Sequence, residues 1–97
     1  MDVKLTDLPN IGAHSADILA QVDITSANQL RQLGAVQAFH RVWFHANRKP
    51  SENLLWVLAG ALENRHWKSF SYEEKKGMLS ALDAHRRAQT LNDELQA

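Results

Sequence analysis

The segment from Leu54 to Leu62 constrains the fold of this chain most strongly, because apolar residues and one glycine fill all nine of its positions. A helix of this composition is apolar on every side, so other elements must surround it. A membrane-spanning helix needs about 20 such residues, which excludes that use of the segment. We therefore expect a buried central helix over residues 52–65, with the rest of the chain packed around it.

The flanking sequence has the spacing of amphipathic helices and no alternating strand pattern of useful length. The expected helices begin after Gly12, after Thr25 or Ser26, near Val36, after Ser51 and after Ser71. In the last of these, Ser71 and Glu74 have the spacing of a capping box. The predicted fold class is all-α, a compact bundle of about five helices.

A length of 97 residues allows one domain. We assign residues 1–90 to it and expect residues 91–97 to be a frayed tail, since the pattern weakens after Arg87. Leu91 and Leu95 would extend an apolar stripe if the last helix continued.

The run Leu8 to His14 is the most informative short segment. Pro9 fixes one φ angle, and Gly12 is free to take a positive φ, so the run predicts a tight turn into a helix N-terminus. This is the turn of a helix-hairpin-helix motif, whose free amides can hold a phosphate. The candidate phosphate or partner site consists of Pro9, Asn10, Ile11, Gly12, Ala13 and His14. The alternative, which we favour, is an ordinary turn that packs Leu8 and Ile11 into the core.

Charge is balanced over the whole chain but unevenly distributed. Residues 1–30 carry four aspartates and one lysine, whereas residues 31–51 carry four basic residues and no acid. The four are Arg31, Arg41, Arg48 and Lys49, and they are the candidate basic support for a phosphate contact. A net charge of zero argues against a strong nonspecific nucleic-acid binder. The two regions are either two solvated faces or a dipolar surface that docks a partner.

Several classes of function find no support in the sequence. The chain has no cysteine, and none of its five histidines has another four residues away, the spacing that pairs two metal ligands on one helical face. Sequence motifs of serine hydrolases, phosphate-binding loops and zinc proteases are absent. We expect no enzyme activity, no cofactor and no metal. With no signal peptide at the N-terminus, a cytoplasmic protein is expected.

Two blocks of residues carry a family resemblance. The first block comprises Leu8-Pro-Asn-Ile-Gly12, Ser15-Ala-Asp17 and Leu33-Gly-Ala-Val36; the second comprises Pro50-Ser51, Asn53-Leu-Leu-Trp56 and His66-Trp67. Together they resemble the C-terminal domain of the TfoX (Sxy) family of bacterial competence regulators. The resemblance covers about residues 5–85. It implies a compact all-α domain, related to helix-hairpin-helix and SAM-like folds, in a family associated with activating transcription of DNA-uptake genes. The family usually has a basic residue just after the hairpin, where this chain has Ala13 and His14.

Two functions remain open. The first is a non-catalytic helical module that binds a protein partner or a second copy of itself in transcription regulation. The alternative is weak, sequence-nonspecific binding to the DNA backbone through the hairpin turn.

Overall fold

The computed structural model describes residues 3–46 and 49–96, except for the side chains of residues 89, 90 and 92–96. Its α-helices are α1 (Ala13–Ala20), α2 (Ala27–Leu33), α3 (Ala35–His45), α4 (Asn53–Glu63) and α5 (Tyr72–Gln96). Single 3-10 turns, η1 (Leu5–Asp7) and η2 (Trp67–Ser69), precede α1 and α5. Extended pairing in these residues is limited to one bridge between Lys4 and Ser26. The prediction of an all-α bundle of five helices is confirmed.

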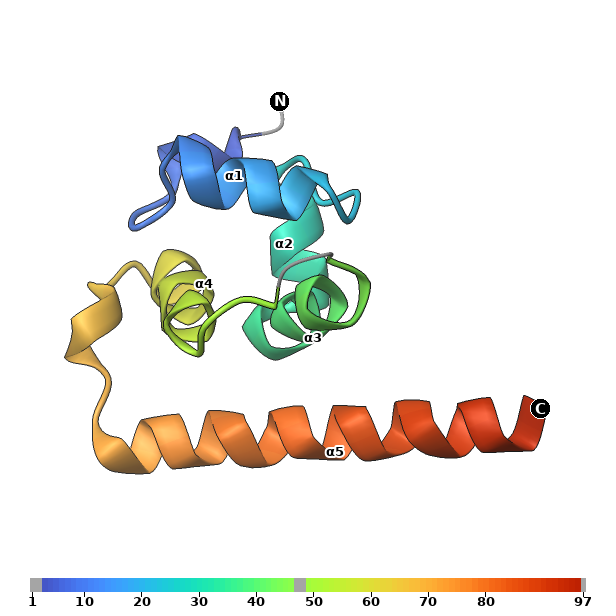
Figure 1. Ribbon diagram of the computed structural model, residues 1–97. Coiled ribbons are helices and arrows are strands. Elements are labelled where there is room, and N and C mark those ends of the chain that lie inside the picture. The colour runs from blue at the N-terminus through green and yellow to red at the C-terminus, as the bar shows by residue number, and fades with distance from the viewer. Residues whose placement is uncertain (1–2, 47–48, 97) are drawn as a thin grey trace.

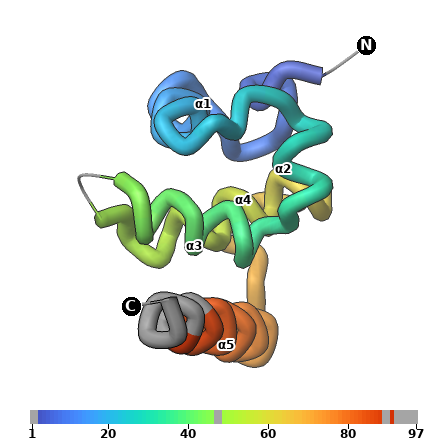
Figure 2. The backbone as a smooth tube through the Cα atoms, turned by 90° about the vertical axis from the view of Figure 1, so that its right-hand side faces the viewer, coloured from blue at the N-terminus to red at the C-terminus, as the bar shows by residue number. Residues whose placement is uncertain are grey.

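The helices form three layers (Figure 1). One layer holds η1 and α1, the middle layer holds α3 and α4, and α5 runs along the far side of α3 and α4. Figure 2 shows the same layers after a quarter turn, with α2 linking the first to the second. The α1 layer and α5 therefore lie on opposite sides of the middle layer.

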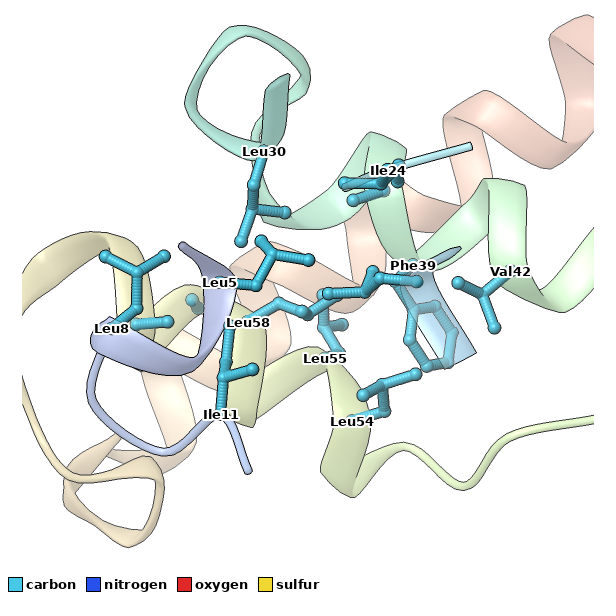
Figure 3. Packing of buried hydrophobic residues seen from close by; sticks show 14 of the residues in the cluster. Leu5, Leu8, Ile11, Ile24, Leu30, Phe39, Val42, Leu54, Leu55 and Leu58 are labelled. Carbon is cyan, nitrogen blue, oxygen red and sulfur yellow. The ribbon is translucent and has the colours of Figure 1, made fainter. Parts of the chain in front are cut away.

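Helix α4 occupies the centre, as its composition predicts. Seven of its eleven residues are buried, and Leu55 and Leu58 are fully enclosed. Leu5, Leu8 and Ile11 gather beside Leu58 (Figure 3), while Phe39 of α3 packs near Leu55. The N-terminal region and α3 thus share one core built on α4.

Most helix ends lie at the residues that the sequence predicts as caps. Ser26 accepts from the Gln29 amide in a capping box, and Gly34 ends α2 with φ +80°. The Ser71 hydroxyl accepts from the Glu74 amide, and the Glu74 carboxylate accepts from the Ser71 amide. The expected cap at Ser51 is wrong: α4 begins at Asn53 after Glu52, without a side-chain cap, and the Ser51 carbonyl accepts from the Leu54 amide instead.

Helix α5 is longer than the sequence pattern predicts. Among the side chains described (residues 72–88 and 91), the last fully enclosed one is Leu82, and the helix continues through Gln96. Its C-terminal part extends past α3, on the side away from α4 (Figure 1). The backbone of residues 91–96 is helical, and fraying of this tail stays a prediction.

Candidate functional site

The turn from Leu8 to Gly12 has a different backbone geometry from the one expected. Asn10 adopts the left-handed conformation, with φ +69°, whereas Gly12 has φ −97° and ψ −172°. The expectation of a positive φ at Gly12 is therefore wrong. Asparagine tolerates the left-handed region better than most residues, since its short polar side chain makes local hydrogen bonds.

Asn10 fastens this turn to the end of α4. Its Nδ2 donates to the Arg65 carbonyl at 2.9 Å, across 55 residues of sequence. A Cβ atom added at Gly60 would lie 2.5 Å from both of these atoms. A glycine inside a helix often marks the close approach of another helix, but the groups that approach Gly60 are a turn side chain and a backbone carbonyl. Gly60 is thus required by the contact that holds the turn.

The six predicted turn residues divide into an inner and an outer set. Ile11 is buried, and Pro9 and Asn10 are half-buried. Gly12, Ala13 and His14 are exposed at the start of α1. The element before the turn is η1, a single 3-10 turn rather than a full helix. The inner set anchors the turn, and the outer set is the more open of the two to a ligand or partner.

The predicted basic residues do not gather at the turn. Arg31 is exposed on α2, where its guanidinium donates to Asn28 Oδ1 at 3.4 Å. Arg41 lines a separate hollow that also contains Asp23. Lys49 lies over the Trp43 ring and donates to the Trp43 carbonyl at 2.5 Å. Arg48 lies outside the described residues.

Beside the outer turn residues lies a groove of about 550 Å³ between α1 and the start of α4. Its apolar lining comes from Ile18, Ala46, Pro50, Leu54 and Val57, and its polar lining from His14, Ser15, Gln21, Lys49, Ser51 and Asn53. The groove therefore joins one predicted turn residue, His14, to one predicted cation, Lys49. Sequence reasoning missed this site because its two walls are about thirty to forty residues apart in the chain.

Replacing Gly12 with serine is expected to raise the free energy of unfolding by about 0.5–1 kcal/mol. Gly12 is the N-cap of α1, has no side chain to cap it, and has open space where a Cβ atom would stand. The serine hydroxyl would accept a hydrogen bond from an amide of the first turn. Serine would also reduce the conformational freedom of the unfolded chain. Urea melts of the two proteins measure the difference. A loss of more than 1 kcal/mol would instead support a positive φ at this position.

Arg65 links the end of α4 to the start of α5, a structural role that sequence reasoning missed. Its guanidinium contacts the Glu74 carboxylate at 2.6 and 3.2 Å and the Ser69 carbonyl at 2.8 Å. It also lies 4.1 Å from the centre of the Phe70 ring. Hydrogen bonds from Arg65, and then from Ser71, lower the pKa of Glu74 to about 2. This network fixes the start of α5 next to the end of α4 and has no role in the groove.

The part of the chain that the structure describes offers neither a metal site nor a membrane span. Among the side chains described, those of residues 3–46, 49–88 and 91, no three from His, Cys, Asp or Glu are arranged to hold a metal ion. No helix in the same residues is long and apolar enough to span a membrane.

Comparison with known proteins gives one family and one solved structure. The family model described as the TfoX C-terminal domain matches residues 1–82. A crystal structure of an uncharacterized protein from Listeria monocytogenes has a TM-score of 0.73 at 24% identity, covering 87% of this chain and 94% of the other. At that identity the likeness shows a shared fold. No curated protein matches this chain.

Proposed function

Because the chain belongs to the TfoX C-terminal domain family, we propose that it is a non-catalytic module of a transcription regulator and that it works by binding a protein partner. The family's association with the transcription of DNA-uptake genes makes competence regulation in the cytoplasm the setting of this proposal. The groove between α1 and α4 is the observation that carries it.

The lining of the groove suits an amphipathic segment of another protein. Ile18, Leu54 and Val57 offer apolar side chains from two helices. The volume of the groove accommodates one or two side chains of a partner. Helix-in-groove recognition uses such a floor, with polar groups at the rim to set the register. His14 and Lys49 stand at the rim and favour a partner segment that carries an acidic residue.

The DNA-binding alternative receives less support from the same geometry. The exposed amides at the start of α1 lie between Asp7, which ends η1, and Asp17 in α1. Both acids are exposed, and within a Debye length of about 8 Å such charges repel a phosphate. Arg31 and Arg41 lie on α2 and α3, so Lys49 alone among the described candidates lines the groove beside the turn.

Asn53→Glu tests the proposal without threatening the fold. Asn53 is exposed at the first turn of α4, where a glutamate interacts favourably with the helix dipole. The new carboxylate stands at the groove rim and repels an acidic partner. We expect the variant to be at least as stable as the parent protein. Its affinity for a partner retained from an extract of the source cell should be about tenfold lower, which corresponds to a loss of about 1.4 kcal/mol in binding free energy.

Ser80→Glu is the matched control, because it makes the same charge change at an exposed position of α5 that does not line the groove. It should retain the partner like the parent protein. After the retained protein is identified and purified, titration calorimetry repeats the comparison. Equal affinity for Asn53→Glu and Ser80→Glu would contradict binding at the groove, and retention of nucleic acid instead of protein would favour the alternative.

A further inference from the structure

The end of α5 combines apolar and acidic residues. We call residues 88–96 the α5 tail. Leu91 is exposed, and Leu95 follows it by about one helical turn, a spacing that places both residues on one side of the helix. Asp93 and Glu94 stand between the two leucines in the sequence. Ligands of helix-binding grooves have apolar anchors at such intervals, so the α5 tail has the sequence pattern of such a ligand.

The α5 tail lies on the other side of the molecule from the groove of its own chain. The groove is between α1 and the start of α4, whereas α5 and α1 lie on opposite sides of the middle layer (Figure 1, Figure 2). The tail continues a helix whose Leu82 is enclosed in the core, so it would reach its own groove only by breaking that helix. The groove of a second copy is not restricted in this way.

The groove and the α5 tail are complementary in polarity and charge. Ile18 and Val57 line the groove and are only half-buried, so part of their apolar surface is open to a ligand. Lys49 stands at the rim, and none of the described residues that line the groove is acidic. An acidic tail would therefore meet a cation and no like charge among these residues, while Leu91 would be removed from water.

We propose that the groove of one copy binds the α5 tail of a second copy, and that two such contacts, one in each direction, form a dimer. This dimer rests on the proposed function only in that the groove is a protein-binding surface. A closed pair occupies both tails and both grooves, whereas contacts in one direction would leave free ends. A partner protein then has to displace the tail before it enters the groove.

Sedimentation velocity of the full chain tests the association. We expect a dimer that dissociates on dilution, with a Kd between about 10 μM and 1 mM, the weak binding of a small transient interface. Leu91→Asp removes an apolar anchor from the tail, and Asn53→Glu repels the acidic tail at the groove rim. Each substitution should weaken dimerisation by about tenfold or more.

Two matched controls make the same kinds of change elsewhere on α5. Ala81→Asp places an aspartate at an exposed position before the tail, and Ser80→Glu adds a glutamate that does not line the groove. Both controls should dimerise like the parent protein. Loss of dimerisation in Ala81→Asp, with none in Asn53→Glu, would show that copies pair through the shaft of α5 and would overturn the binding of tail to groove.

Mixing the two interface variants tests whether the tail and the groove bind each other. Asn53→Glu keeps an intact tail and Leu91→Asp keeps an intact groove, so the mixture restores one of the two contacts. Immobilised Leu91→Asp should retain Asn53→Glu about tenfold better than either variant retains itself. A parent chain that stays monomeric up to about 1 mM, undiminished dimerisation of either variant, or no gain in the mixture would each overturn the proposed dimer.

Retention of the partner from the extract separates this dimer from the proposed function. Leu91→Asp has an intact groove, so it should retain the partner at least as well as the parent protein. A monomeric parent chain that loses the partner through Asn53→Glu would refute the dimer alone. Dimerisation that Asn53→Glu weakens, together with equal partner retention in Asn53→Glu and Ser80→Glu, would support the dimer and refute the proposed function.

Discussion

Replacing Leu58 with alanine is expected to lower the free energy of unfolding by about 2–5 kcal/mol, a large part of the 5–15 kcal/mol that holds a typical domain. Leu58 is fully enclosed near the middle of α4, where side chains from the N-terminal turn region pack beside it. The alanine would leave a cavity that neighbours from several elements line, so the site has little freedom to collapse. Urea denaturation followed by tryptophan fluorescence measures the loss.

Leu91→Ala serves as the control for this substitution. It removes the same atoms from α5, at a side chain that is 58% exposed. Its effect should stay within about 0.5 kcal/mol, as for other surface changes. Similar losses in the two variants would mean that α4 is not the centre of the core.

The second large effect is expected at Gly60, where alanine should lower the free energy of unfolding by about 1–3 kcal/mol. In an exposed helix, replacing glycine by alanine stabilises by about 1 kcal/mol. Here the added methyl group would lie 2.5 Å from the Arg65 carbonyl and from Asn10 Nδ2. Relieving that overlap requires a backbone shift and breaks the hydrogen bond between these two groups.

Gly77→Ala isolates the contribution of helix propensity. Gly77 lies in α5 and has nothing within 4 Å of an added Cβ, so alanine should stabilise the protein there. A loss of stability for Gly60→Ala together with a gain for Gly77→Ala, both measured by urea melts, supports the close approach at Gly60. A gain in stability at both positions would contradict it.

The two glycines and the hairpin turn show where sequence reasoning succeeds and where it stops. Helix positions follow from local spacing and caps, so Ser26, Gly34 and Ser71 could be interpreted without a structure. The turn could not, because both asparagine and glycine adopt a positive φ and the choice between Asn10 and Gly12 depends on the Arg65 carbonyl, 55 residues away. Similarly, a glycine inside a helix indicates a close contact but does not identify the group that makes it.

The candidate site depends still more on long-range packing. Arg41 and Lys49 are eight residues apart, yet Arg41 lines a hollow with Asp23 and Lys49 lines the groove with His14. Runs of charge in a sequence therefore did not indicate which cations share a surface. The sequence pattern also underestimates the length of α5, since none of the side chains described beyond Leu82, those of residues 83–88 and 91, is buried.

The most direct test of the central claim, that this domain binds protein rather than DNA, is a fluorescence-anisotropy titration with a labelled duplex of about 20–30 base pairs, the size of a bound site. We predict a Kd no tighter than about 10⁻⁴ M in physiological salt, the weak end of nonspecific binding. The contradicting result is a micromolar Kd whose logarithm changes with the logarithm of salt concentration at a slope that corresponds to about four neutralised phosphates, roughly −4 for log K. It contradicts the claim if the substitutions Arg41→Glu and Arg48→Glu abolish this DNA binding.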